Sequence, residues 1–154
     1  MLKALIPIDG SAHSLGAVRH AIKLVKDREP LEIHLLNVQL PTRSDVSMFV
    51  SGDMIHEFHE QEAAEALAPA CRLLDEAGVP YTKHVAVGHC AETIAAWAGE
   101  LHCDKLIMGT RGLGTMSQLF LGSVTHEVIH RIDPAIPVTL VKGGIDPASP
   151  HQHR

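Results

Sequence analysis

A group of glycine and hydroxyl residues between positions 109 and 125 has the composition of a phosphate-binding loop. Gly109, Gly112 and Gly122 lie in it, and Ser123 and Thr125 follow where a helix is expected to begin. The first turn of a helix attracts anions, because its N–H groups lack intrahelical acceptors and the helix dipole is positive there. Glycine lets the backbone approach a phosphate closely and adopt positive φ angles. On residue types alone, the segment is either a polyphosphate cradle or a plain tight turn.

Two common phosphate motifs do not describe this segment. A P-loop has lysine after its second glycine, whereas Thr115 stands after Gly114. The dinucleotide pattern G-x-G-x-x-G needs glycine where Ser117 stands, and it follows the first strand of a βαβ unit rather than the fourth. A phosphate site in this segment would therefore belong to another class.

Other reactive residue types are not arranged as a catalytic site. None of the serines lies in a G-x-S-x-G elbow. Cys71, Cys90 and Cys103 lack the C-x-x-C spacing of metal sites, which favours three free thiols. His56 and His59 have a spacing that a metal site can use, but such a pair on a polar helix face more often belongs to a solvated surface. We therefore predict no catalytic residue.

The elements that must position these residues alternate between short apolar runs and longer stretches with helical periodicity. Strands are expected at residues 3–8, 32–38, 80–87, 105–108 and 137–141, the third of them at a sheet edge. Helices are expected after a cap at Ser11 or Ser14, at 53–77, around 94–101 and around 121–132. Pro69 should kink or divide the second helix. The order βαβαβαβαβ predicts an α/β three-layer sandwich around one parallel sheet.

Composition limits the possible functions. The 154 residues are 45% apolar and 20% charged, which fits one domain with a sizeable core and excludes a disordered chain. A net charge of −5 and only 3% aromatic residues argue against nucleic-acid partners. No apolar run approaches the ~20 residues of a membrane helix. We expect a cytoplasmic protein without membrane contact, with a domain at residues 1–143 and a flexible tail at 144–154.

The glycine spacing resembles one family closely. Gly109-x₂-Gly112-x₉-Gly122-Ser123 matches the nucleotide-binding motif G-x₂-G-x₉-G-[ST] of the universal stress protein family. Segments 6–11 (Ile-Pro-Ile-Asp-Gly-Ser), 37–38 (Asn-Val) and 107–109 (Ile-Met-Gly) resemble the family's strand ends in the same order. The resemblance covers nearly the whole chain. It implies a single-domain, flavodoxin-like and Rossmann-like fold whose five-stranded parallel sheet has the order 3-2-1-4-5, with ATP in the crevice between strands one and four.

The resemblance also assigns site residues by position. Asp9 would contact the ribose or a Mg²⁺ or Mn²⁺ ion bound to the phosphates. Adenine would lie against Pro7, Ile8 and Val38, and the ribose beside Met108 and Gly109. The phosphates would be held by Gly112, Gly122, Ser123, Val124 and Thr125. Arg111 either adds a cation near the phosphates or points into solvent.

The function implied by the resemblance is that of an ATP-binding regulatory protein of the stress response, acting as a nucleotide-dependent switch on a regulatory protein partner that the sequence does not identify. Strand 137–141 is expected to pair with its copy in a homodimer, and loop 39–52 to become ordered by nucleotide. One alternative is slow ATP hydrolysis or autophosphorylation at Ser117 or Ser123. Binding is favoured over turnover, because the loop lacks the lysine that phosphoryl transfer commonly uses. A nucleotide-free dimeric scaffold is the other alternative, against which the intact glycines weigh.

Overall fold

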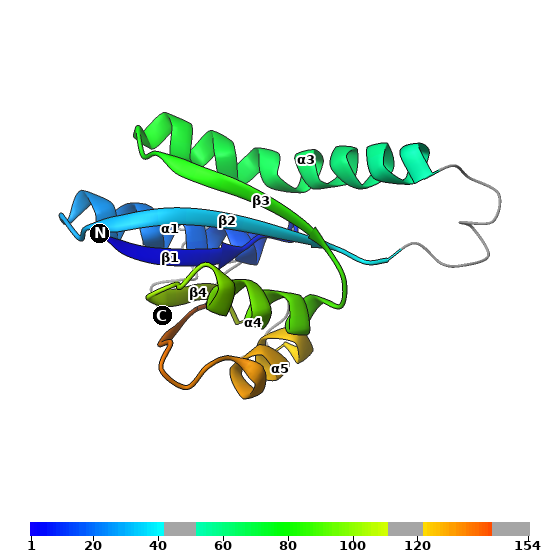
Figure 1. Ribbon diagram of the computed structural model, residues 1–154. Coiled ribbons are helices and arrows are strands. Elements are labelled where there is room, and N and C mark those ends of the chain that lie inside the picture. Colours follow the sequence, from blue (N-terminus) through cyan, green and yellow to red (C-terminus); the bar gives the residue numbers. More distant parts are fainter. Residues whose placement is uncertain (42–51, 111–121, 143–154) are drawn as a thin grey trace.

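The structure is a computed structural model that describes residues 1–41, 52–110 and 122–142 (Figure 1). Five parallel strands form one sheet in the order β3-β2-β1-β4-β5. The strands are β1 (Leu2–Pro7), β2 (Leu31–Gln39), β3 (Tyr81–Val87), β4 (Lys105–Gly109) and β5 (Val138–Val141). The helices are α1 (Ala12–Lys26), α3 (Gly52–Ala77), α4 (Cys90–Glu100) and α5 (Ser123–Arg131). The predicted fold class and strand order are confirmed.

The sheet is covered on both faces. Helices α1 and α3 lie on one side of it and α4 and α5 on the other, as Figure 1 shows. Side chains of successive strand residues point to opposite faces, so Ile6 joins the core under α1 and α3 while Leu5 joins the core under α4 and α5. Both are fully buried. This two-sided burial explains why β1 is a continuous apolar run rather than an alternating one.

The carboxyl end of β1 is tied to β2 by hydrogen bonds. Pro7 is the last residue of the strand, in register with Leu36, at the end where its missing N–H was predicted to be tolerated. Just beyond it, the Ile8 N–H donates to the Leu36 carbonyl over 2.8 Å. The buried Asn37 amide donates to the Ile8 carbonyl, also over 2.8 Å. These bonds hold the residues after β1 in place at the edge where Asp9 emerges.

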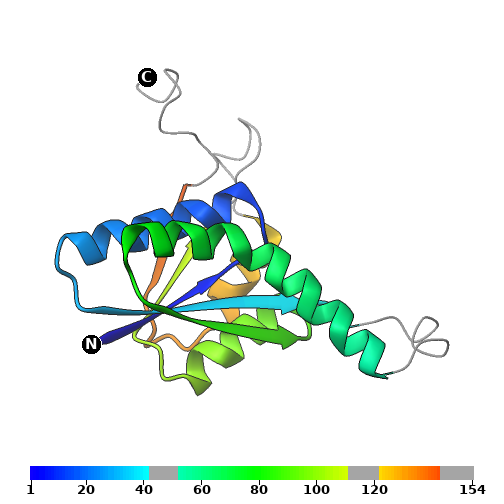
Figure 2. The same ribbon diagram turned by 90° about the horizontal axis from the view of Figure 1, so that it is seen from above.

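Two predictions for the helices left alternatives open, and the structure decides between them. Pro69 does not divide α3, which continues from Gly52 to Ala77, although Figure 2 shows that its axis changes direction along its length. Ser11 is the N-cap of α1, but it makes no side-chain cap hydrogen bond. Its hydroxyl donates instead to the Asp9 carboxylate.

Parts of the sequence predictions fall outside the described residues. These parts are the tail at 144–154 and residues 42–51 of the loop expected to respond to nucleotide. Within the described part of the chain, no helix is both long and apolar enough to cross a membrane.

Candidate functional site

A cleft of about 830 Å³ lies at the carboxyl ends of β1 and β4. The order of the strands in the sheet changes direction between these two neighbours. From β1 the chain continues to β2 and β3 on one side of the sheet, and then to β4 and β5 on the other side. Open α/β sheets bind ligands at such a switch point, since the loops leaving the two strands diverge to opposite faces. The first turns of α1, α4 and α5 also contribute residues to the cleft.

The binding residues predicted from the sequence come together here. Every one of them that the structure describes lines the cleft: Pro7, Ile8, Asp9, Val38, Met108, Gly109, Gly122, Ser123, Val124 and Thr125. Arg111, Gly112 and the possible acceptor Ser117 lie outside the described residues.

One wall of the cleft is aliphatic. Ile8, Val38 and Met108 provide apolar surface from three neighbouring strand ends, and Ile94 adds to it from α4. Cys90, at the beginning of α4, lies beside this wall, and burial raises the pKa of its thiol, with a smaller contribution from the Asp9 charge. A neutral thiol among aliphatic side chains suits a flat, weakly polar group such as a nucleobase better than a charged one.

Asp9 is held in a defined orientation at the mouth of the cleft. One carboxylate oxygen, Oδ1, accepts the Ser11 N–H over 2.9 Å and the Ser11 hydroxyl. Burial raises the pKa of Asp9, but the hydrogen bonds from Ser11, together with the charge of His13, lower it by more. The Asp9 pKa is therefore below its usual value, and the carboxylate is ionised at neutral pH. The side chain remains 66% exposed to solvent.

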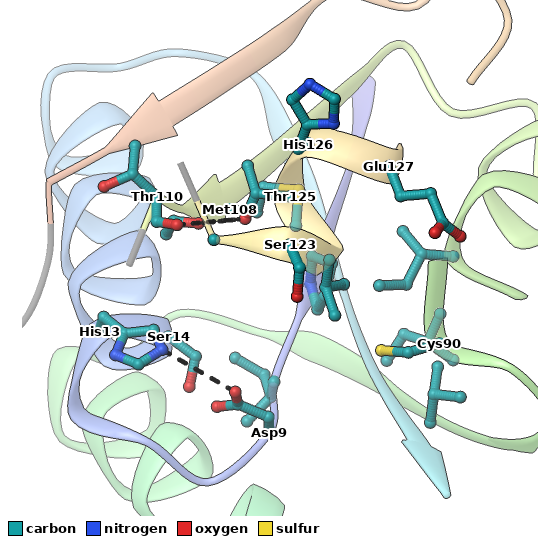
Figure 3. Close-up of a pocket in the computed structure, with 18 residues that line it drawn as sticks. Asp9, His13, Ser14, Cys90, Met108, Thr110, Ser123, Thr125, His126 and Glu127 are labelled. Carbon is teal, nitrogen blue, oxygen red and sulfur yellow. Dashed lines mark hydrogen bonds and ion pairs between the residues drawn. The ribbon is translucent and has the colours of Figure 1, made fainter. Parts of the chain in front are cut away.

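His13, on the first turn of α1, was not identified from the sequence. Its Nε2 lies 3.9 Å from Asp9 Oδ2, as the dashed line in Figure 3 indicates. Its other nitrogen, Nδ1, is buried and has no hydrogen-bond partner within residues 1–41, 52–110 and 122–142. The i, i+4 spacing of Asp9 and His13 was the available signal, but a strand end followed by a turn does not by itself bring such a pair together.

The glycine at 109 is explained by packing. A Cβ atom built on Gly109 would lie 2.7 Å from the His13 carbonyl oxygen, far inside van der Waals contact. Backbone from α1 therefore passes so close to the end of β4 that no side chain fits between them. The sequence pattern assigned Gly109 to the ribose; the structure adds this close approach of α1.

The Thr125 hydroxyl does not point toward a ligand as the sequence suggested. It lies 3.0 Å from the Gly109 carbonyl oxygen and 3.3 Å from that of Thr110, and it donates toward them. Thr125 is only 4% exposed. Its side chain thus joins the beginning of α5 to the end of β4.

The beginning of α5 presents N–H groups to the cleft. Gly122 is the N-cap and has extended backbone, with no side-chain cap hydrogen bond and no acidic residue in the first turn. Intrahelical bonding begins when the His126 N–H donates to the Gly122 carbonyl over 2.9 Å. The N–H groups of Ser123, Val124 and Thr125 precede this bond and have no acceptor within the helix. Such a terminus favours an anion.

The comparisons with known proteins agree with this site. A model of the universal stress protein family matches residues 1–142. The chain belongs to the universal stress protein family. It is 34% identical to universal stress protein MJ0531 of Methanocaldococcus jannaschii over 146 residues, which cover 91% of this chain and 81% of that relative.

Solved structures of the family have the same fold. The structure of MJ0577, another universal stress protein of Methanocaldococcus jannaschii, has a TM-score of 0.75 and 27% identity, covering 94% of this chain and 98% of that one. A universal stress protein in complex with cAMP has a TM-score of 0.67 and 24% identity, covering 92% and 97%. A family protein from Arabidopsis thaliana with AMP bound has a TM-score of 0.68 and 18% identity, covering 98% and 99%.

The charges around the cleft of this universal stress protein are unusual for a phosphate site. None of the lining residues that the structure describes is a lysine or an arginine. Glu127 is compensated, because its carboxylate accepts a hydrogen bond from Arg131 Nε over 3.1 Å. The second carboxylate oxygen of Asp9, Oδ2, lies 3.9 Å from His13 Nε2, which is longer than a hydrogen bond. An ionised carboxylate oxygen facing a cleft fits a divalent cation, which Asp9 would hold together with phosphate oxygens.

Proposed function

We propose that this universal stress protein binds ATP in the cleft between β1 and β4 and acts as a nucleotide-dependent regulatory switch. The observation that carries the proposal is the convergence of the described motif residues on one cleft, with uncapped N–H groups at the beginning of α5. The family members solved with cAMP and with AMP support an adenine nucleotide as the ligand class.

The lining of the cleft supports one orientation of the nucleotide. The aliphatic wall made by Ile8, Val38 and Met108 suits adenine. The Asp9 carboxylate suits the ribose hydroxyls or a Mg²⁺ or Mn²⁺ ion on the phosphates. The N–H groups that begin at Ser123 suit the phosphates themselves. The nucleotide would thus run from the ends of β1 and β2 toward α5.

Binding is favoured over turnover by the charges of the site. Phosphoryl transfer requires a positioned nucleophile and strong neutralisation of the phosphates. Among the described lining residues, the cationic side chains that usually provide this neutralisation are absent. We therefore propose a protein that holds ATP and changes its interaction with a regulatory protein partner in the cytoplasm, with slow hydrolysis as the second candidate.

The same proposal includes a homodimer formed through β5. This strand ends the sheet next to β4, so its other edge has no neighbouring strand among the described residues. Leu140 on it is 36% exposed. An open edge that carries apolar residues pairs readily with another strand, and two copies related by a twofold axis would extend the sheet across the dimer.

The direct test identifies the nucleotide carried by the protein. The full-length protein is purified without added nucleotide and denatured, and the released small molecules are separated by chromatography. Recovered ATP supports the switch, and ADP with released phosphate supports hydrolysis. A protein that releases no nucleotide and also fails to bind added ATP in calorimetry contradicts both.

A matched pair of glycine variants tests the position of the phosphates. Gly122 has φ −60° and ψ 152°, which any residue adopts, so Gly122→Val should fold while its side chain blocks the approach of a phosphate to α5. Gly99→Val is the control, because a Cβ there meets nothing within 4 Å. We expect ATP affinity to fall at least about tenfold in the first variant only. Unchanged affinity in Gly122→Val would place the phosphates elsewhere.

A further inference from the structure

The second oxygen of the Asp9 carboxylate faces an imidazole nitrogen without bonding to it. Ser11 occupies Oδ1 through its N–H and its hydroxyl. Oδ2 is turned toward Nε2 of His13 at 3.9 Å, which is longer than a hydrogen bond. Figure 3 shows the two side chains on the same side of the cleft, with Ser123 and the beginning of α5 opposite them. Two donor atoms with lone pairs therefore border one small space beside the place proposed for the phosphates.

His13 is held in this position by the backbone. Its carbonyl oxygen lies against the end of β4, where only the absence of a side chain on Gly109 makes room for it. The ring is also mostly buried, with 23% of its side chain exposed. A ligand side chain that is already fixed loses little conformational freedom when it binds an ion.

The proposed ligand carries more negative charge than the described lining of the cleft neutralises. The phosphates of ATP bring several negative charges into a cleft whose described lining contains no lysine or arginine. The uncapped N–H groups of α5 supply only partial positive charge, equivalent to about half an elementary charge at a helix terminus. A divalent ion beside Asp9 would provide the remaining compensation.

We propose that Asp9 and His13 together ligate the divalent cation that accompanies the bound nucleotide, and that the imidazole makes this site select Mn²⁺ over Mg²⁺. The inference rests on the proposed ATP binding and adds a ligand and a metal preference to it. Nitrogen donors favour transition-metal ions, whereas Mg²⁺ prefers an all-oxygen shell. Phosphate oxygens and water would complete the coordination.

The geometry needs only a small adjustment for this role. Two adjacent ligand atoms on one ion, each about 2.1–2.2 Å from it, lie roughly 3.0–3.5 Å apart. The Asp9–His13 separation of 3.9 Å reaches that range through a small rotation of either side chain.

The experiment measures metal preference and ligation in the full-length protein. ATP binding is titrated by calorimetry with Mg²⁺, with Mn²⁺ and with a chelator present. Pulsed electron paramagnetic resonance of the Mn²⁺–ATP complex then detects whether an imidazole nitrogen is bonded to the ion. The variants are His13→Phe, which keeps an aromatic ring without a ligand atom, and His56→Phe as the control, because the His56 side chain is 74% exposed and does not line this cleft.

We expect the unaltered protein to bind ATP at least about tenfold more tightly with Mn²⁺ than with Mg²⁺ and to show nitrogen coupling. His13→Phe should lose both the preference and the coupling while still binding ATP with Mg²⁺. His56→Phe should retain both. Equal affinity with the two ions, or coupling that survives in His13→Phe, overturns the proposal although ATP binding stands. If the protein binds ATP in none of the three conditions, the proposed function itself is overturned.

Discussion

At the scale of single residues, the glycines of the motif meet two different physical needs. Gly109 is required by the protein itself, because a Cβ would collide with the His13 carbonyl at 2.7 Å. Gly122 has an ordinary backbone conformation that does not require glycine, and under the proposed function its lack of a side chain would let a phosphate approach. The two positions should therefore respond differently to substitution.

Gly109→Ala should destabilise the protein with or without nucleotide. The added methyl group pushes α1 away from β4, and such overpacking costs typically about 1–3 kcal/mol. Urea unfolding of the two proteins measures this change. Gly99→Ala, in an open position of α4, serves as the control and should be neutral or stabilising by up to about 1 kcal/mol. Equal stability of Gly109→Ala and the unaltered protein would mean that α1 moves freely.

Thr125 and Ser123 provide a second residue-level contrast. Thr125→Val removes the hydroxyl that donates to the Gly109 and Thr110 carbonyls, which should lower the free energy of unfolding by about 1–2 kcal/mol. Ser123→Ala should leave stability within about 0.5 kcal/mol and weaken ATP binding about tenfold, because Ser123 lines the cleft. Unfolding curves and calorimetric titrations of both variants separate the two effects. A loss of ATP affinity without any loss of stability in Thr125→Val would contradict the structural role.

At the scale of elements, α3 shows how tertiary packing overrides a local signal. Pro69 removes one helical hydrogen bond, which predicts a kink or a break. Leu67 and Ala70 flank it, and both are buried in the same core, which continues to Leu74 one turn later. Burial on one face thus holds both halves of the helix against the sheet, and the helix continues through Pro69 without breaking.

Strands β2 and β3 carry a histidine pair beneath α4. His34 Nδ1 lies 2.8 Å from His84 Nε2, and His34 Nε2 lies 2.6 Å from a Glu32 carboxylate oxygen. The His84 ring also contacts the indole of Trp97 on α4, with 5.1 Å between ring centroids. Burial, followed by the charge of His34, lowers the pKa of His84, so this ring is neutral in the folded protein at neutral pH.

The lowered His84 pKa predicts that stability decreases in mild acid. The unfolded chain takes up a proton on this residue near pH 6.5, before the folded protein does. The contribution of His84 to the free energy of unfolding is therefore fully present above about pH 6.5, and it declines as the pH falls toward the pKa of His84 in the folded protein. Melting temperature and fluorescence of Trp97, the chain's one tryptophan, should both decline between pH 8 and 5. His84→Asn should flatten this dependence, whereas His56→Gln, whose parent side chain is 74% exposed, should retain it.

At the scale of the whole molecule, the open edge of β5 determines how two copies would assemble. The Leu106 N–H donates to the Pro137 carbonyl and the Thr110 N–H to the Val141 carbonyl, so alternate β5 residues bond to β4. By the two-residue period of a strand, Val138 and Leu140 direct their backbone groups to the other edge. Those groups are available to a second copy.

Leu140→Pro should therefore convert a dimer into a monomer without unfolding it. Proline removes an N–H that faces outward and leaves the bonds between β4 and β5 intact. Sedimentation velocity measures the mass, and circular dichroism checks the fold. Lys142→Ala, just beyond the strand, is the control and should remain dimeric. A folded Leu140→Pro variant that is still a dimer would assign the interface to another surface.

The sequence by itself determined the order and type of the elements, the parallel sheet and the place of the cleft. Apolar periodicity is a local property, and the carboxyl ends of parallel strands necessarily meet at one edge, so Asp9 and the glycine loop had to converge. Only the tertiary structure decided what the side chains do there. Two of these contacts join segments far apart in the chain: His13 approaches Gly109, and the Thr125 hydroxyl bonds to the end of β4. The third, between Asp9 and His13, depends on how the turn after β1 folds back. Packing distances of a few ångströms set these contacts, and residue spacing does not encode them.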